Sequence, residues 1–222
     1  MSDALIILNA RHIEPVKAAL AELPIAKIWL TGYTELEISN GVFADAIAST
    51  SFDRYLVSSD DILIRPHALA AVIDVWERGY DVVTGYSQRS HTDWTVNLTE
   101  APIQTLTPGK GAYRFREYAD VAAWPDPIVP TWFAGFSITG MPRDLWERFP
   151  FGCFHDGIND PGHASDFHLS LRLQEAGIPI GAAREGFAYH WRHGYGYLHP
   201  DDARLLLGDL EQGITVEEPV AA

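Results

Sequence analysis

An apolar run that stops abruptly at small polar residues is the feature that most constrains the fold. Residues 55–57 are apolar, residues 58–61 are Ser or Asp, and apolar character resumes at Ile62. This pattern is typical of a buried strand that delivers polar side chains to the rim of a sheet, where open α/β folds bind ligands. The paired carboxylates of Asp60 and Asp61 are hard oxygen ligands that suit Mg²⁺ or Mn²⁺. The alternative is an ordinary polar turn, since Ser and Asp are common turn residues.

The sequence on either side of this run alternates between strand and helix patterns. Residues 4–8 and 26–31 are apolar runs typical of strands, and residues 14–23 between them carry a helical periodicity that begins with proline. A second helix is predicted from residue 65 to a glycine at 79, followed by a strand at 80–85. Because β-α-β units give parallel strands with right-handed crossovers, we predict a mostly parallel sheet flanked by helices.

The pattern changes after residue 85. Prolines and glycines interrupt residues 86–130, which we interpret as a partly irregular insertion with an antiparallel strand at 92–98. Residues 132–140 form an aromatic, glycine-punctuated run that predicts a further strand. Short strands are also expected at 178–182, as a sheet edge, and at 187–190. Insertions of this kind commonly carry specificity, because loops held on a rigid scaffold supply contact residues.

Composition and charge exclude several classes of protein. The 222 residues suit one large domain or two small ones, and with 47% hydrophobic residues a substantial core can form. Because no Gly/Ser linker divides the chain, we expect a single domain over 1–222. The net charge of -14 disfavours general DNA binding, because no basic excess exists to release counterions. Cys153 is the only cysteine, so an intrachain disulfide and a cysteine-rich zinc site are excluded. Without a signal-peptide pattern or an apolar stretch of about 18 residues, we expect a cytoplasmic protein with no membrane insertion.

Four segments carry a further pattern. Residues 40–61 lead from Asn-Gly through a short helix into Ser-Ser-Asp, and residues 135–144 combine a Gly-rich strand with an Arg-Asp pair. Residues 165–177 begin with Ser-Asp and end in Ala-Gly, and residues 187–190 end in histidine. In order and spacing these segments resemble the GT-A glycosyltransferases, most closely the inverting family 2 group. The resemblance covers about residues 3–193 of the chain.

The resemblance implies a fold and an activity. The fold is α/β and GT-A, with a Rossmann-like, mostly parallel sheet flanked by helices and a small antiparallel extension on the acceptor side. Residues 1–85 would bind the nucleotide sugar, 86–199 would bind the acceptor, and 200–222 would form a C-terminal helix and tail. The implied reaction moves a sugar from a nucleotide-diphosphate sugar to an acceptor hydroxyl, with inversion and with Mn²⁺ or Mg²⁺ as cofactor. The class of acceptor stays open.

The resemblance also implies a donor and metal site. Asp60 is expected to be the main metal ligand and His190 a second, while Asp61 can supply the charge that Ser58 lacks at the first position of the family's DxD motif. The alternative for His190 is a structural histidine. Besides Asp60, the residues expected to contact the donor are Asn9, Arg11, Asp45, Ser58, Ser59 and Arg192. The alternative for Asn9 and Arg11 is an ordinary polar loop pair.

On the acceptor side, Asp166 is the candidate general base. It lies at the head of a predicted helix, where the helix dipole favours a charged carboxylate. The alternative is that Asp166 is only a helix cap, for which Asp is a common residue. Acceptor contacts are expected from Trp132, Gly135 and Phe136, although core packing is the more usual role of a Trp.

Two other functions stay open from the sequence. His and Asp residues gather between 155 and 168 and could hold a transition metal in a hydrolase, although no His-Glu-x-x-His spacing occurs there. A chain that lacks the charge at Ser58 could also be a non-catalytic domain that binds nucleotides or carbohydrates. Consumption of a nucleotide sugar would separate the transferase from both alternatives.

Overall fold

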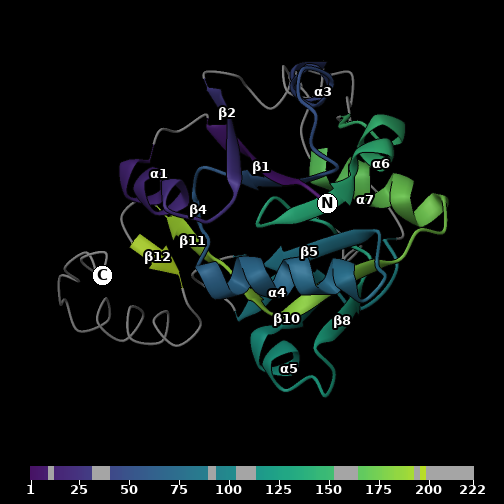
Figure 1. The fold of residues 1–222 in the computed structure, drawn as a ribbon. Helices are drawn as coiled ribbons and strands as arrows, with labels where there is room; N and C mark the ends of the chain where they lie inside the picture. The colour runs from purple at the N-terminus through teal and green to yellow at the C-terminus, as the bar shows by residue number, and fades with distance from the viewer. Residues whose placement is uncertain are drawn as a thin grey trace, which may run out of the picture.

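The computed structural model describes residues 1–9, 13–31, 41–89, 94–103, 114–152, 165–192 and 196–198. The helices and strands, labelled in Figure 1 where there is room, are β1 (Asp3–Asn9), α1 (Glu14–Ala21), β2 (Ala26–Thr31), α3 (Phe43–Ala48), β3 (Arg54–Ser59), β4 (Ile62–Leu63), α4 (Pro66–Glu77), β5 (Val82–Tyr86), β6 (Thr95–Thr99), β7 (Phe115–Glu117), α5 (Tyr118–Ala122), β8 (Ile128–Thr131), β9 (Thr139–Pro142), α6 (Arg143–Arg148), α7 (Ser165–Glu175), β10 (Ile180–Phe187), β11 (Tyr189–Arg192) and β12 (Gly196–Leu198).

A seven-stranded sheet in the order β2-β1-β3-β9-β5-β10-β8 forms the centre of the molecule. Strand β1 is parallel to β2 and β3, and β5 is parallel to β10. Because β9 lies antiparallel to both β3 and β5, all five of these strands run in one direction, and only β9 and β8 run in the other. The mostly parallel α/β sheet flanked by helices that the sequence predicts is therefore confirmed.

Side-chain alternation along the central strands builds two separate cores, one on each face of the sheet. In β1, Leu5 and Ile7 pack in the core formed with α1 and α4, whereas Ile6 and Leu8 pack in the core formed with α3, α6 and α7. Figure 1 shows α4 lying across the sheet beside β5 and β10. A strand buried on both faces has no solvent-facing side, and this explains the unbroken apolar runs in its sequence.

The two halves that the sequence predicts are interleaved in this one sheet. Strands β8, β9 and β10 come from the second half, and β9 inserts between β3 and β5 of the first. Two smaller sheets, β12-β11-β4 and β6-β7, are antiparallel and supply the expected antiparallel extension. The predicted helix within 200–222 lies outside the described residues. No helix in the described part of the chain is long and apolar enough to cross a membrane.

Three strand predictions require correction. Residues 132–138 are not a strand, because their backbone groups bond to the ends of other strands instead; the carbonyls of Phe136 and Ile138, for example, accept from Ser59 and Gly85. Only β9 continues from there as a strand. The predicted edge strand at 178–182 is part of β10, which lies between β5 and β8 inside the sheet. Residue 187 ends β10, and β11 then leaves the main sheet to pair with β4.

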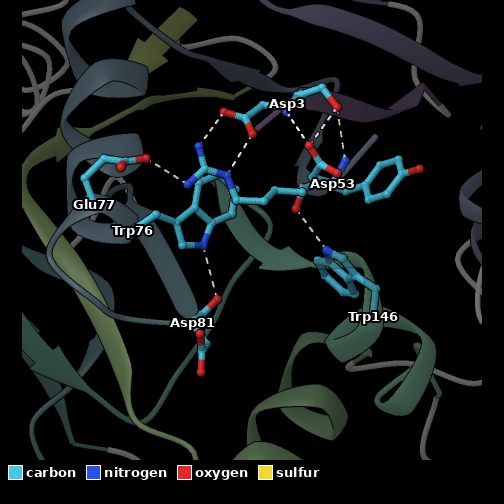
Figure 2. A network of polar contacts seen from close by, with 9 residues as sticks. Asp3, Asp53, Trp76, Glu77, Asp81 and Trp146 are labelled. Carbon is cyan, nitrogen blue, oxygen red and sulfur yellow. Dashed lines mark hydrogen bonds and ion pairs between the residues drawn. The ribbon is translucent and has the colours of Figure 1, made fainter. Parts of the chain in front are cut away.

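A closed network of charges fixes the amino end of β3 (Figure 2). The guanidinium of Arg54 forms two parallel hydrogen bonds of 2.8 and 2.9 Å to Asp3 and a third of 2.9 Å to Glu77. The guanidinium carbon also lies over the ring of Trp76, 4.4 Å from the ring centroid. These contacts, led by the bond to Asp3, raise the pKa of Arg54. Planar, bidentate pairing with an aromatic face behind it suits arginine and not lysine.

Candidate functional site

A cavity of about 320 Å³ opens where β3 and β5 end, on the carboxyl side of the parallel strands. The lining side chains come from the segments that follow β3 and β5, from β6, β7 and β11, from residues 133–137 and from the start of α7. They are Ser59, Asp61, Ile62, Ser87, Gln88, Arg89, Asn97, Phe115, Phe133, Phe136, Ser137, Asp166, Phe167 and His190. The rim location is the one expected for ligands of an open α/β sheet.

Asp61 and His190 meet at the wall of this cavity. The Nε2 atom of His190 lies 3.1 Å from the Oδ2 atom of Asp61. Strand β11 carries His190 here because it pairs with β4, which places His190 opposite Ile62, and the amide of Trp191 donates to the carbonyl of Asp61 at 2.7 Å. Two residues 129 positions apart in the sequence are thus joined through a short antiparallel pairing.

The ring of His190 faces a hydrogen-bond acceptor on each side. Its Nδ1 atom lies 3.2 Å from the carbonyl oxygen of Gln88, and its Nε2 atom faces the carboxylate of Asp61. A neutral imidazole has only one N–H, so a proton on Nδ1 leaves two acceptors facing each other at Nε2. With the proton on Nε2 the ring donates to Asp61 instead. With the proton on Nδ1, the Nε2 lone pair and the carboxylate of Asp61 are placed to share a cation, and an Nδ1–H bond to a carbonyl is the usual support of a metal-binding histidine.

The two acids that follow β3 lie in different surroundings. Asp60 is fully buried, its amide donates to the carbonyl of Leu8 at 3.2 Å, and its side chain does not line the cavity. Asp61 is also buried but lines the cavity beside His190. The sequence predicts Asp60 as the main metal ligand and Asp61 as an addition; that assignment stays a prediction, but the geometry favours Asp61.

The two serines before these acids also differ. Ser58 is fully buried and its hydroxyl donates to the carbonyl of Ser137 at 2.8 Å, so it fastens β3 to the segment before β9. Ser59 lines the cavity, and its amide donates to the carbonyl of Phe136 at 3.0 Å. Of the predicted motif Ser58-Ser59-Asp60, only Ser59 has its side chain at the cavity.

Asp166 lines the same cavity from the first turn of α7. Its Oδ1 atom accepts from the amide of Phe167 at 2.8 Å, and its carbonyl accepts from Ser170 at 2.6 Å. Ser170 also accepts from the amide of Ala134 at 2.9 Å, which ties α7 to residues 133–137. The structure therefore brings the predicted base into one cavity with Asp61 and His190.

Three polar side chains of the lining are bonded to one another. The hydroxyls of Ser87 and Ser137 lie 2.7 Å apart, Asn97 donates to Ser137 at 3.0 Å, and its Oδ1 accepts from the amide of Ser87 at 2.7 Å. Gly135 packs against them, since a Cβ there would lie 2.5 Å from the side-chain nitrogen Nδ2 of Asn97. The predicted Gly135 thus permits close packing of the wall, and the predicted Phe136 lines the cavity itself.

The remaining predicted residues lie elsewhere or outside the described part. Asp45 is exposed on α3 and does not line the cavity. Trp132 lines a second cavity of about 280 Å³ beside Tyr80. Arg11 lies outside the described residues, as do the side chains of Asn9 and Arg192.

Sequence reasoning missed most of the second wall of the cavity. The residues that it did not name include Gln88, Arg89, Asn97, Phe115 and Phe167. Most of them fall in the insertion at 86–130, where proline and glycine signal irregular structure but give no indication of which side chain faces inward. The one signal that could have found a member is the position of Phe167 directly after Asp166.

The alternative hydrolase cluster is only partly visible. Residues 153–164 lie outside the described part, and His168 does not line the cavity. Its ring packs on Gly152, where a Cβ would lie 2.6 Å from the imidazole, and burial followed by the charge of Arg172 lowers the pKa of His168. Among the described residues, no group of three His, Cys, Asp or Glu side chains is arranged to hold a metal.

Comparison with known proteins identifies a shared fold but no activity. No protein-family model matches the chain, and no curated protein matches it. The chain is similar to the crystal structure of A197 from STIV over 91% of its length and 92% of that chain, with a TM-score of 0.58 and 16% identity. At this identity the likeness shows a shared fold alone.

Two further solved structures are more distant. The mannosyltransferase PcManGT from Pyrobaculum calidifontis, in complex with GDP-Man and Mn²⁺, is similar over 84% of this chain and 55% of that one, with a TM-score of 0.47 and 12% identity. A CMP:2-keto-3-deoxy-manno-octonic acid synthetase complexed with CTP is similar over 96% of this chain and 83% of that one, with a TM-score of 0.41 and 15% identity. The predicted membership of family 2 stays a prediction.

Proposed function

We propose that the chain is a glycosyltransferase that moves a sugar from a nucleotide-diphosphate sugar to an acceptor hydroxyl, with inversion and with Mn²⁺ or Mg²⁺. One observation carries the proposal: Asp61, His190 and Asp166, from three separate elements, line one cavity at the carboxyl end of a mostly parallel sheet. A carboxylate–imidazole pair and a separate carboxylate in one cavity match the two needs of the reaction, which are charge stabilisation on the leaving group and proton removal from the acceptor.

The residues present fit a divalent cation that is shared with a ligand. Asp61 offers an anionic oxygen and His190 an imidazole nitrogen whose partner nitrogen faces the carbonyl of Gln88. Two protein ligands are few for an all-protein cage, but Mg²⁺ sites commonly use one or two side chains together with phosphate oxygens and water. When bound, the cation would act as a Lewis acid that stabilises the charge developing on the diphosphate.

Asp166 would act on the acceptor. Its carboxylate lies at the cavity from the first turn of α7, where the helix dipole favours the charged, proton-accepting form. The 2.8 Å bond from the amide of Phe167 to Oδ1 orients the carboxylate at the cavity, where it would meet the acceptor hydroxyl. A carboxylate that acts as a base, and forms no covalent bond to the sugar, permits direct displacement at the anomeric carbon. Direct displacement inverts the configuration of that carbon.

The test is a screen of the purified chain against nucleotide-diphosphate sugars, with release of the nucleoside diphosphate as the readout. We expect release from one donor, dependent on Mn²⁺ or Mg²⁺ and increased by an acceptor alcohol. Release of pyrophosphate from a nucleoside triphosphate instead would identify a nucleotidyltransferase. Binding without release would identify a non-catalytic domain, and hydrolysis of other substrates without any nucleotide would favour the metal cluster at 155–168.

A further inference from the structure

The acceptor side of the cavity differs in chemistry from the side that holds Asp61 and His190. Three phenylalanines that line it pack as one cluster: the ring of Phe133 lies 4.7 Å from that of Phe167, and Phe115 lies 6.0 Å from Phe133 and 6.5 Å from Phe167. Phe167 directly follows Asp166 in the sequence. The proposed base therefore lies at the border of an aromatic wall, which we define as Phe115, Phe133 and Phe167.

We infer that the acceptor is an alcohol carried on a planar aromatic group, and that the aromatic wall is what selects it. The inference rests on the proposed function, because it names the substrate class of the same site. Rings that pack edge-to-face or offset on other rings gain about 0.5–1.5 kcal/mol per pair beyond the burial of area. An aromatic acceptor can make such contacts with the wall while its hydroxyl reaches Asp166.

The internal hydrogen bonds of three polar lining residues disfavour a polyol acceptor. Selection of a sugar by its hydroxyls needs several polar groups directed at the ligand. Here the hydroxyl of Ser87 and the side-chain amide of Asn97 both bond to the hydroxyl of Ser137, at 2.7 and 3.0 Å, and Asn97 also accepts from the backbone amide of Ser87 at 2.7 Å. Binding a polyol would require those bonds to be exchanged, whereas an aromatic alcohol needs partners for a single hydroxyl.

Arg89 covers one face of Phe115 with a planar group. Its guanidinium carbon lies 3.7 Å from the ring centroid of Phe115, and both side chains line the cavity. A guanidinium is planar and stacks on aromatic faces as well as donating hydrogen bonds. The combination of ring edges and a guanidinium plane favours a flat ligand over a puckered apolar ligand of similar size.

The transfer step on such an acceptor is balanced. The hydroxyl proton moves to the carboxylate of Asp166, and the freed oxygen lone pair forms a bond to the anomeric carbon of the sugar. The bond from that carbon to the diphosphate breaks, and its electron pair leaves with the nucleoside diphosphate. No oxidant, reductant or further reactant is needed.

The experiment compares three alcohols with the donor found in the nucleotide-sugar screen: benzyl alcohol, cyclohexylmethanol and methyl glucoside. Benzyl alcohol and cyclohexylmethanol differ in planarity, and methyl glucoside is the polyol. We expect kcat/KM to be at least about 10-fold higher for benzyl alcohol than for either of the others, since several ring contacts at the energies above add to one order of magnitude. Equal or better use of methyl glucoside would overturn the inference.

Variants locate the effect. Phe115→Ala should raise KM for benzyl alcohol by about 10-fold with a smaller change in kcat, because it removes contact area and leaves Asp166 in place. Phe52→Ala is the matched control: it truncates a part-buried phenylalanine that packs on Tyr55, near the opposite end of β3, and should leave KM unchanged.

Two further outcomes separate this inference from the proposed function. If Phe115→Ala weakens binding of the nucleoside diphosphate and leaves KM for the alcohol unchanged, the wall binds the nucleobase and the inference is overturned alone. Transfer of the sugar to water or to methyl glucoside, but not to benzyl alcohol, with release of the nucleoside diphosphate, would also overturn it alone. No release with any donor, metal or alcohol would overturn the proposed function and this inference with it.

Discussion

The two ends of β3 hold buried charges in opposite ways. At the amino end, Arg54 is surrounded by two carboxylates and the ring of Trp76, and its hydrogen bonds run to groups within the chain (Figure 2). At the carboxyl end, Asp61 and His190 lie at an open cavity, and the histidine ring faces acceptors on both sides. The first arrangement is closed off within the chain, and the second presents a carboxylate and an imidazole to a cavity.

The difference shows how one strand can serve both stability and chemistry. A buried charge whose partners are all internal stabilises one conformation, because removing any partner leaves the others uncompensated. A carboxylate and an imidazole that meet at an open cavity are instead placed to contact a ligand. Functional sites in α/β sheets commonly lie at the carboxyl ends of the strands, so a closed network at the amino end does not interfere with binding.

The largest effect is expected for Asp166→Asn. The amide keeps the shape of the side chain but cannot take a proton, so turnover should fall by about 10²-fold or more while nucleotide binding is retained. Asp144→Asn is the matched control, since Asp144 is an exposed acid in the first turn of α6. Steady-state rates with the same donor and acceptor decide the matter. Transfer near the wild-type rate would leave Asp166 as a helix cap only.

A large effect on stability is expected for Arg54→Ala. The substitution leaves Asp3 without its bidentate partner and exposes the face of Trp76, so the free energy of unfolding should fall by about 3 kcal/mol. Arg78→Ala is the control, because Arg78 pairs with Asp74 at the surface, and it should cost less than about 0.5 kcal/mol. Urea unfolding measures both. Similar losses for the two variants would mean that solvent screens the Arg54 network.

The smallest effect concerns His168, which lies on α7 with Asp166 but does not line the cavity. Burial lowers its pKa from 6.5, so the unfolded chain binds a proton at a pH where the folded protein does not. Stability should therefore be complete above about pH 6.5 and decrease as the pH falls toward the folded pKa. Between pH 7.5 and 5.5, Tm should fall further in the wild type than in His168→Gln. Identical profiles would show that this face of α7 is not sensitive to protonation of His168.

As a control for that titration, His67→Gln removes an exposed histidine from α4. Its Tm profile between pH 7.5 and 5.5 should follow that of the wild type. If Tm changes less with pH in His67→Gln than in His168→Gln, the pH dependence belongs to His67 on α4 and the account of His168 is wrong.

The sequence predicts the central fold well because burial on both faces leaves a direct trace in it. The apolar run of β1, residues 55–57 of β3 and the two valines that begin β5 admit few other structures. Pro66 at the start of α4 and Gly79 after its end limit that helix. Residues 132–138 mislead because they are as apolar as a strand. Their backbone instead bonds to the ends of β3 and β5, which a local pattern cannot reveal.

The site could be predicted only in part for a related reason. Asp61, His190 and Asp166 carry chemistry that the sequence displays, and their presence in one cavity follows from the order of elements. Whether Asp60 or Asp61 faces the cavity depends on the course of the turn after β3, which brings Asp61 to the cavity and leaves Asp60 buried away from it. In the aromatic wall, Phe115 belongs to the insertion, where inward and outward side chains have no period, and Phe133 and Phe167 come from two other segments that only the fold brings together.

The most direct test of the account is a thermal melt with nucleoside diphosphates, with Mn²⁺ or Mg²⁺ and with EDTA. At about 100 times its Kd, the best nucleotide should stabilise the wild type by about 2.7 kcal/mol, and only with the metal present, because metal and diphosphate complete each other's coordination. Asp61→Asn should lose most of this stabilisation, whereas Asp126→Asn, at an exposed position, should keep it. Equal stabilisation in EDTA, or an undiminished response in Asp61→Asn, would contradict the assignment of the cation site to Asp61 and His190.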